Sequence, residues 1–425
     1  MQEGRRLPHP TPNRRSLIAL DALNAVLADV RDGLGPYLAI YLVAVRGPSH
    51  GWSEASAGAV MTIAGIAGLI AQAPAGGLVD RIHAKRALLI AAAVAVTLSS
   101  ISLPLVDGFA PVVIGQSVAA VAAAVFAPAI AAISLGIVGP KLFTRRVGRN
   151  EAFNHAGNAV SAGLAGVLAF SFGPQVVFWL MGLFAALSIG ATLMIDPRAI
   201  DHRVARGMGD GEGKDPPQSI FATLRNHPTI AAFAFAAFLF HLANAAMLPT
   251  VGQQLARIVG SGSATSLVAA CIVGAQVVMV PVALIVGART DRWGRKPLFL
   301  AAFAMLTLRG FLYPLSDAPA WLLGVQLLDG IGAGIFGALF PIVIADMTRG
   351  TGRFNVAQGA VATVQGLGGA LSASLAGSIV VLGGFGPAYW TLAGVGAAGL
   401  IFYALFIPET RPREIADGTL HPRLA

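Results

Sequence analysis

The chain has 425 residues, of which 56% are apolar and only 12% are charged. Soluble domains carry about twice this share of charge, so the composition predicts a membrane protein with many spans and excludes a water-soluble one. The net charge of +9 does not indicate nucleic-acid binding, because the basic residues stand in short runs between apolar segments.

Several kinds of site are excluded by what the sequence lacks. Residues 1–15 are polar, and the apolar segment after them carries charges and no small-residue cleavage site, so no cleavable signal is expected. The single cysteine, Cys271, excludes an intramolecular disulfide and a cysteine-cluster metal site. Nucleotide P-loops, zinc-ligand spacings and Ser/His/Asp hydrolase motifs are absent. We therefore expect no enzyme, no catalytic residues, no cofactor and no metal.

The sequence predicts an all-α membrane protein with twelve transmembrane helices. A helix needs about 20 apolar residues to cross the hydrocarbon core. Gly, Pro or charged residues separate the segments of sufficient length, and the first, fourth, seventh and tenth segments are long enough to be tilted or broken. The twelve segments are 17–45, 55–79, 86–106, 110–139, 150–171, 175–196, 228–254, 264–288, 297–315, 319–346, 355–381 and 387–407.

The basic residues set the expected orientation. With a cytoplasmic N-terminus, 25 of the 29 Lys and Arg residues fall on the inner side. Only Arg46 and Arg257 fall in outer loops, and Arg31 and Arg309 lie within spans. Cytoplasmic loops are enriched in Lys and Arg, so this split predicts both termini inside and an even number of spans.

The chain is expected to divide into two repeated halves around one polar linker. Gly, Pro and charged residues dominate positions 197–227, so this linker reads as flexible. Asp80, Arg81 and Lys85 recur 211 positions later as Asp291, Arg292 and Lys296. Such duplication is typical of two pseudo-symmetric six-helix bundles. The expected parts are a tail at 1–16, a bundle at 17–196, the linker at 197–227, a bundle at 228–407 and a tail at 408–425.

Two further pairs support the repeat. Gln116 and Phe126 in span 4 match Gln326 and Phe336 in span 10, both 210 positions apart. Gly148-Arg149 before span 5 parallels Gly352-Arg353 before span 11. Equivalent spacing therefore extends over the length of both halves.

On these features the sequence resembles the major facilitator superfamily of secondary transporters over essentially its full length. That family has a loop motif G-x-L-x-D-R-x-G-R-K between spans 2 and 3. The copy at 76–85 keeps the Gly, Leu, Asp, Arg and Lys, but has His83 and Ala84 where Gly and Arg are usual. The copy at 287–296 keeps nearly all of the motif. The resemblance does not assign a subfamily, since the span 4 Arg and span 5 Gly-Pro-x-x-Gly of drug/proton antiporters are missing.

The resemblance implies a gating role for these loops. Their Asp can face the N-terminus of a neighbouring helix, where the dipole favours an anion. Their Arg residues can pair with carboxylates at other helix ends and break those pairs when the transporter opens inward. The alternative is that the basic residues only determine topology. The expected gating residues are Asp80, Arg81, Lys85, Asp291, Arg292, Arg295 and Lys296, with Glu151 and Asp346 as carboxylate partners.

Span 1 holds charges near the middle of the membrane. Asp29 and Asp32 share a helix face, and Arg31 on an adjacent face can neutralise one of them. Charges at this depth are expensive and commonly functional. Burial raises the pKa of such an acid and a nearby cation lowers it, as proton coupling requires. The alternative is a static network that holds span 1 to a neighbour.

Span 7 is the pseudo-symmetric counterpart of span 1. His241 and Asn244 lie three residues apart on one face. Histidine titrates near neutral pH, so His241 is a second candidate for proton coupling. It could equally be a neutral ligand that hydrogen-bonds the transported solute.

Neutral polar residues in other spans are candidates for the solute cavity. In the family, spans 1, 4, 7 and 10 line the central cavity and spans 2, 5, 8 and 11 flank it. The alternative for each residue is a hydrogen bond between helices. The candidates are Asn24, Gln116, Asn158, Asn244, Gln276, Gln326 and Gln365. Arg309 is expected to snorkel outward or to pair with Asp329.

These features predict a transporter that moves a small organic solute by alternating access, with proton-coupled efflux favoured. Proton-coupled uptake, uniport and Na⁺ coupling are alternatives, and a receptor or scaffold that kept the fold is an alternative of another class. Phosphorylated solutes are disfavoured, because Arg31 alone could meet a central anion. We expect a monomer in a lipid bilayer, the plasma (bacterial inner) membrane, with the solute and protons as partners and no nucleic acid.

Overall fold

The computed structural model describes residues 13–32, 38, 41–46, 51–52, 54–172, 176–208, 225, 227–259 and 261–412. Those residues form helices and turns, with no strand among them. The side chains of Asp29, Arg31 and Asp32 lie outside the described part, although their backbone lies in the first helix. The all-α prediction is confirmed.

The helices follow one another with short connections. The N-terminal part contains α1 (Arg14–Asp32), η1 (Tyr41–Arg46), α4 (Glu54–Arg81), α5 (Lys85–Ile101), η2 (Leu103–Leu105), α6 (Phe109–Ala123), α7 (Phe126–Phe172) and α8 (Val176–Met194). The linker contains η3 (Pro197–Ala199) and η4 (Val204–Arg206). The C-terminal part contains α10 (Pro228–Asn244), α11 (Met247–Val259), α12 (Ser261–Trp293), α13 (Arg295–Leu312), η5 (Tyr313–Leu315), α14 (Pro319–Met347), α15 (Phe354–Gly383) and α16 (Phe385–Phe406).

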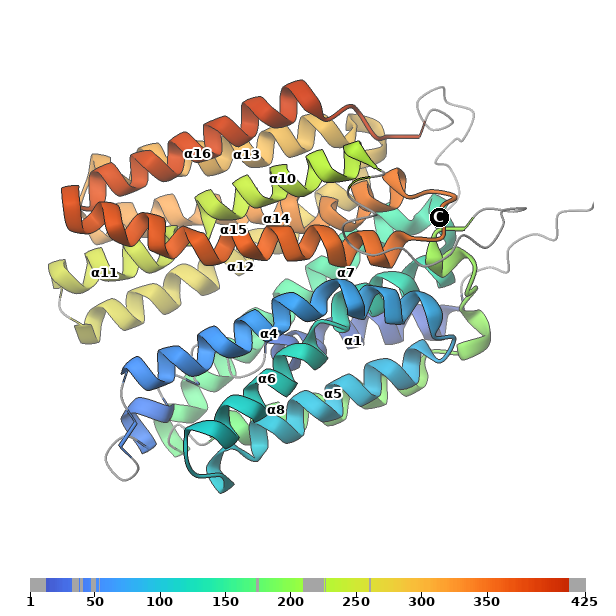
Figure 1. Ribbon diagram of the computed structural model, residues 1–425, viewed down its shortest axis with the longest axis horizontal. Coiled ribbons are helices and arrows are strands. Elements are labelled where there is room, and N and C mark those ends of the chain that lie inside the picture. Colours follow the sequence, from blue (N-terminus) through green and yellow to red (C-terminus); the bar gives the residue numbers. More distant parts are fainter. Residues whose placement is uncertain are drawn as a thin grey trace, which may run out of the picture.

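The helices pack as two groups that lie one above the other in Figure 1. In the N-terminal group, α1 packs against α7 and α8, α4 against α6, and α5 against α6 and α8. In the C-terminal group, α10 packs against α15 and α16, α13 against α14 and α16, and α12 against α11 and α14. The two groups meet where α7 contacts α12 and where α4 contacts α15.

The helix ends define two faces. We call the face with the α4–α5 and α12–α13 turns, the linker and the end of α16 the linker face, and the other the opposite face. Ten described segments are long and apolar enough to cross a membrane. One of them, Phe109–Ala165, has 57 residues. At about 1.5 Å per residue it greatly exceeds a core of about 30 Å, so it crosses more than once.

That long segment reverses at a glycine on the linker face. Gly139 has a φ of 71° inside α7, and Pro140 follows it. A positive φ suits glycine, and proline cannot continue the hydrogen-bond ladder of the preceding helix. The expected spans 4 and 5 thus join here without a loop, whereas the expected span 1 begins in α1 and runs into residues outside the described part.

Two of the four long spans are broken. A turn at Ala124–Val125 separates α6 from α7, and a turn at Ala245–Ala246 separates α10 from α11. The tenth span, by contrast, is the continuous helix α14. Backbone groups freed at a break need partners inside the protein, and Ser372 on α15 supplies one by accepting from the backbone N–H of Ala246 at 2.9 Å.

The two groups touch closely near the linker face. We call the α4–α15 contact the first seam and the α7–α12 contact the second seam. In the second seam, a Cβ on Gly148 would lie 2.5 Å from both the Ala283 carbonyl oxygen and Gly287 Cα. In the first seam, a Cβ on Gly76 would overlap the backbone of Asn355. Glycine therefore permits backbone contact in both seams, and the structure is closed at the linker face.

The first part of the linker is packed against both groups. The backbone N–H of Asp201 donates to the Gly136 carbonyl at 3.0 Å, and the Gly207 carbonyl accepts from Gly350 N–H at 2.7 Å. Ala205 is fully buried, and its carbonyl accepts from Asn355 Nδ2 at 3.2 Å. The sequence reads as flexible over 197–227, but 197–208 is ordered by these contacts, because its small residues fit against α7 and α15.

We expect Gly157→Ala to destabilise the N-terminal group. A Cβ at this position of α7 would overlap the carbonyl oxygen of Ala25 on α1. Forcing such helices apart should lower the free energy of unfolding by roughly 1–3 kcal/mol. Gly163→Ala on the same helix is the matched control, since a Cβ there meets nothing within 4 Å. Apparent unfolding temperatures in detergent test this, and equal temperatures for the two variants would contradict the close α1–α7 packing.

Candidate functional site

The predicted coupling residues of span 1 fall in the last turns of α1. Asp29, Arg31 and Asp32 belong to this helix, but their side chains lie outside the described part, so their pairing stays a prediction. Asn24, a predicted cavity residue, is buried and donates to the Leu20 carbonyl of its own helix at 2.7 Å. In this arrangement one N–H of its amide is used within α1.

Asp21 on α1 anchors a buried charge cluster that joins α1 to α7. Arg146 donates to Asp21 Oδ1 at 2.6 Å, and Arg149 reaches Oδ2 at 2.7 Å. Arg146 also donates to Asn150 at 2.6 Å. In the sequence the two arginines are among the 25 basic residues of the inner side, and the charge pattern alone does not predict their contact with Asp21. The recurrence of Arg at 146 and 149, one helix turn apart, was the available signal.

A second buried charge cluster lies in the C-terminal group. Arg309 on α13 forms an ion pair with Asp329 on α14 and is only 1% exposed. Arg309 also donates to Asn244 Oδ1 at 2.5 Å and contacts Met247 Sδ at 3.1 Å. Asn244 and Met247 flank the α10–α11 break. We call these four residues the Arg309 cluster, and it ties the break to α13 and α14.

The cluster continues along α14 toward the opposite face. Gln326 Nε2 donates to Asp329 Oδ2 at 3.2 Å, and Gln326 Oε1 accepts from the Tyr313 hydroxyl. Gln326 and Tyr313 are fully buried. In this conformation the predicted cavity residue Gln326 is engaged by protein groups. Of the two alternatives for Arg309, the structure has the pair with Asp329.

His241 on α10 meets Gln365 on α15. Gln365 Nε2 lies 3.0 Å from His241 Nε2, and His241 Nδ1 lies 3.1 Å from the Ala237 carbonyl oxygen. With Gln365 donating, Nε2 accepts and Nδ1 carries the proton, so the ring is neutral. If the amide turned over, Gln365 Oε1 would accept from a doubly protonated ring. The pair can therefore hold His241 with or without a second proton.

The remaining predicted cavity residues are dispersed. Gln116 is buried on α6, and its Nε2 has no hydrogen-bond partner within the described part of the chain. Asn158 is half-buried on α7. Gln276 on α12 lies in the second seam, where its Oε1 is 2.7 Å from His155 Nδ1 on α7. The structure thus brings Gln276 to the N-terminal group, Gln365 to His241 and Gln326 to Asp329.

The first loop motif crosses between the groups. Asp80 accepts from the backbone N–H of Val356 at 3.1 Å and from Asn355 Nδ2 at 2.7 Å, at the start of α15. An anion is favoured at this position by the helix dipole. Lys85 is buried and donates to the Val79 and Ile82 carbonyls of its own loop, while Arg81 is exposed. Asp80 is therefore the member of this motif that bridges the first seam.

The side-chain bonds of the second loop motif stay within the C-terminal group, whereas its Gly287 meets Gly148 in the second seam. Arg295 donates to Asp291 and Asp346, each at 2.8 Å. Lys296 Nζ donates to the Ala404 carbonyl at 2.7 Å, and Arg292 is exposed. The predicted partner Asp346 thus pairs with an arginine of its own group. The predicted partner Glu151 lies near His155 instead, with Oε2 3.9 Å from its Nε2.

Glu409, which follows α16, caps the start of α13. Its carboxylate accepts from the backbone N–H groups of Arg295 at 2.9 Å and Lys296 at 3.1 Å. Burial raises the pKa of this carboxyl, but the backbone donors and the Arg295 charge outweigh it and hold the pKa below its usual value. The tail after α16 therefore fixes the second loop motif, a contact that sequence reasoning missed.

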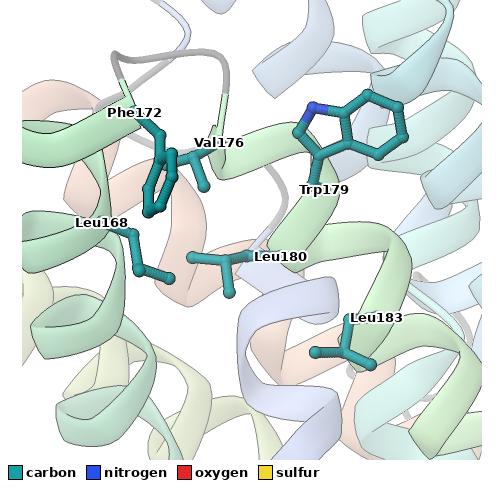
Figure 2. Close-up of a pocket in the computed structure, with 6 residues that line it drawn as sticks. All are labelled: Leu168, Phe172, Val176, Trp179, Leu180 and Leu183. Atoms are coloured by element: carbon teal, nitrogen blue, oxygen red, sulfur yellow. The ribbon is translucent and has the colours of Figure 1, made fainter.

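An apolar depression lies where α7 ends and α8 begins. Its volume is about 460 Å³, and its lining side chains are Leu168, Phe172, Val176, Trp179, Leu180 and Leu183 (Figure 2). The lining carries no charged group, and Trp179 is 79% exposed. Such a surface suits lipid chains rather than a polar solute, so we do not place the solute site here.

Comparisons with known proteins agree on one family. The family model described as Major Facilitator Superfamily matches residues 22–255 and 233–422. An uncharacterized MFS-type transporter of Mycobacterium tuberculosis is 55% identical over 398 residues, which cover 93% of this chain and 94% of that protein.

Two solved structures share the fold. The MFS transporter FucP in the outward conformation aligns with a TM-score of 0.72 at 13% identity, over 92% of this chain and 98% of that chain. The human organic anion transporter MFSD10 aligns with a TM-score of 0.70 at 15% identity, over 92% and 99%. At these identities the likeness concerns the fold alone.

We expect Asp329→Leu to destabilise the C-terminal group strongly. The change leaves Arg309 buried without its counter-ion, which costs roughly 3–5 kcal/mol. The double variant Arg309→Met/Asp329→Leu should recover most of this loss, because two apolar side chains can replace a buried pair. Apparent unfolding temperatures in detergent measure both effects.

The control for this prediction is the Arg46–Asp107 pair. Asp107 is 72% exposed, and Arg46 also donates to the carbonyls of Leu103, Pro104 and Val106, so Asp107→Ala should change stability by less than about 1 kcal/mol. A double variant no more stable than Asp329→Leu alone would show that the Arg309–Asp329 charge pair is not the source of the effect.

Proposed function

Because the chain belongs to the Major Facilitator Superfamily of transporters, we propose that it moves a small organic solute across the membrane by alternating access, driven by protons. The observation that carries the proposal is the set of titratable and charged groups held inside apolar helices. Lipid offers them neither water nor hydrogen bonds, so polar groups retained at this depth commonly serve transport. Efflux is the direction we favour.

The distribution of contacts supports alternating access. Each helix group is tied internally by buried charge pairs, Asp21 with Arg146 and Arg309 with Asp329. The two groups meet through glycine contacts and a few hydrogen bonds. Ion pairs within each group and close glycine contacts between the groups suit rocking of one bundle against the other. The bundles we propose as units are 17–196 and 228–407, joined by the linker 197–227.

Proton coupling is assigned to Asp29, Asp32 and Arg31 in span 1 and to His241 in span 7. His241 supports the assignment because its contact with Gln365 fits either protonation state of the ring. The neighbouring polar groups Asn24, Gln116, Asn158, Asn244, Gln276, Gln326 and Gln365 are proposed to meet the solute as the bundles move. Several of them hydrogen-bond protein partners in the closed state and would have to exchange these for solute.

The loop residues are proposed as gates that release when the linker face opens. Asp80 supports this role because its carboxylate bridges to the start of α15. Arg81 and Arg292 are exposed, and Lys85, Asp291, Arg295, Lys296 and Asp346 bind within their own groups, so they would act by holding the loops rigid. The excess of Lys and Arg supports a cytoplasmic linker face, with both termini inside, in the plasma (bacterial inner) membrane. We propose a monomer.

We expect Asp29→Asn, Asp32→Asn and His241→Gln each to abolish proton-driven accumulation. An amide cannot exchange the proton that an acid or imidazole carries, whereas solute exchange without a gradient should persist. A solute is first chosen from a metabolite and antibiotic panel by its thermal stabilisation of the pure protein. Proteoliposomes with an imposed pH gradient then give accumulation and counterflow for each variant.

Asp107→Asn is the control, since Asp107 lies in an exposed turn on the opposite face. If Asp29→Asn and Asp32→Asn both still accumulate the solute against its gradient, the coupling assignment in span 1 is wrong. A receptor or scaffold would bind the solute but show no counterflow in the unmodified protein.

A further inference from the structure

The second seam contains a histidine that bridges the two helix groups. His155 on α7 places Nδ1 2.7 Å from Gln276 Oε1 on α12. With this amide oxygen as the acceptor, Nδ1 carries the hydrogen and donates it. The bond joins helices of different groups, and Gln276 is the middle residue of the expected span 264–288, so separation of α7 from α12 would break it.

The other ring nitrogen of His155 faces an acid. His155 Nε2 is buried and, among the described residues, has no hydrogen-bond partner. Glu151 Oε2, one turn earlier on α7, lies 3.9 Å away. Because Nδ1 carries the hydrogen, a neutral ring would point a lone pair at an ionised carboxylate. A proton on either group turns this repulsion into attraction.

The Glu151–His155 pair has no equivalent in the first seam, although the two halves of the chain are repeats. The alignment of Gly148 with Gly352 places Glu151 opposite Asn355. In the first seam, Asn355 donates to the loop acid Asp80. In the second seam the loop acid is Asp291, and two ionised acids cannot bond. Asp291 pairs with Arg295 instead, and Glu151 is left beside His155.

Other charges around Glu151 are already engaged. On α1, Asp21 binds Arg146 and Arg149. On α14, which approaches Glu151 at Gly337, Asp346 binds Arg295. On α7 itself, Asn154 Nδ2 lies 3.5 Å from Glu151 Oε2. On α12 the group that faces His155 is the neutral Gln276. Asp80 belongs to the other seam, where it binds Asn355 and Val356. Among the described residues, the basic group in contact with the Glu151 carboxylate is His155, at 3.9 Å.

We propose that Glu151 and His155 form a proton site that seals the second seam. A proton that enters from the opposite face binds His155 Nε2 and leaves Nδ1–H bonded to Gln276. The resulting imidazolium pairs with the Glu151 carboxylate across one helix turn. Opening of the linker face breaks the Gln276 bond and hydrates Glu151, so Nε2 releases the same proton to that side. This site rests on the proton-coupled transport proposed above and adds a gate to it.

Pulsed electron paramagnetic resonance on the full chain tests the site without a solute. Spin labels are placed at Ala84→Cys and Trp293→Cys, exposed positions of the two groups on the linker face, in a Cys271→Ser background. Distances are recorded in lipid nanodiscs from pH 5 to pH 9. Because the closed state binds one more proton than the open state, the closed-to-open ratio should fall by up to about tenfold per pH unit on alkalinisation.

Two variants should weaken this dependence. Glu151→Gln places a neutral amide beside Nε2, and His155→Gln keeps a donor for Gln276 while removing the titrating ring. Each should give a closed fraction that changes less with pH than in the unmodified protein. His227→Gln, a histidine at the start of α10, is the matched control and should keep the unmodified response.

If the distances in the protein without these substitutions do not respond to pH, the inference is overturned. It is also overturned if Glu151→Gln and His155→Gln both respond to pH as strongly as that protein does. Proton-driven accumulation in proteoliposomes tests the proposed function separately. A pH response that both variants weaken supports the gate even if accumulation fails. Accumulation with no pH response supports proton-driven transport while it rejects the gate.

Discussion

A charged side chain in an apolar helix must find its partner inside the protein, and this constraint organises both helix groups. Asp21 forms ion pairs with Arg146 and Arg149, and these pairs hold α1 against the second half of α7. Arg309 finds Asp329 and Asn244, which fixes α13 and α14 on the broken span α10–α11. Each bundle is thus held by a buried ion pair, and we propose that it moves as one unit.

The contacts between the bundles depend on glycine. At Gly148 and Gly76 the helix backbones approach so closely that any side chain would displace the partner helix. We propose that polar groups beside these glycines decide when the seams close. The first seam uses Asp80 at the start of α15, and the second uses His155 with Gln276. The duplicated sequence therefore carries two seams with different chemistry.

The sequence predicted the features that follow from composition and spacing. The all-α fold with many apolar spans, the unusual length of spans 4 and 7 and the pairing alternative for Arg309 could be read from apolar lengths and charge. Asp80 lies beside a helix N-terminus, the placement expected from the helix dipole, although its gating role stays a prediction. The rotation of each helix could not be predicted, because these spans are apolar on every face.

That missing rotation explains what sequence reasoning overlooked. His155 and Gln276 are 121 positions apart, and nothing in either span showed that they face each other. Arg146 and Arg149 were read as topology residues, because their partner Asp21 lies on another helix. Glu151 was expected to meet an arginine of a loop motif, but Arg295 is held by Asp291 and Asp346. In each case the partner of the side chain lies on a helix that is distant in the sequence.

In the proposed alternating access, closing one face opens the other, and a distance across the opposite face tests this most directly. Labels at Leu105→Cys and Leu382→Cys, 83% and 87% exposed on the two groups, report this distance in the Cys271→Ser background. Gly148→Ala places a Cβ against the Ala283 and Gly287 backbone and should force the linker face apart. We expect a shorter distance across the opposite face in Gly148→Ala than in Gly163→Ala. An equal or longer distance would contradict alternating access by these two bundles.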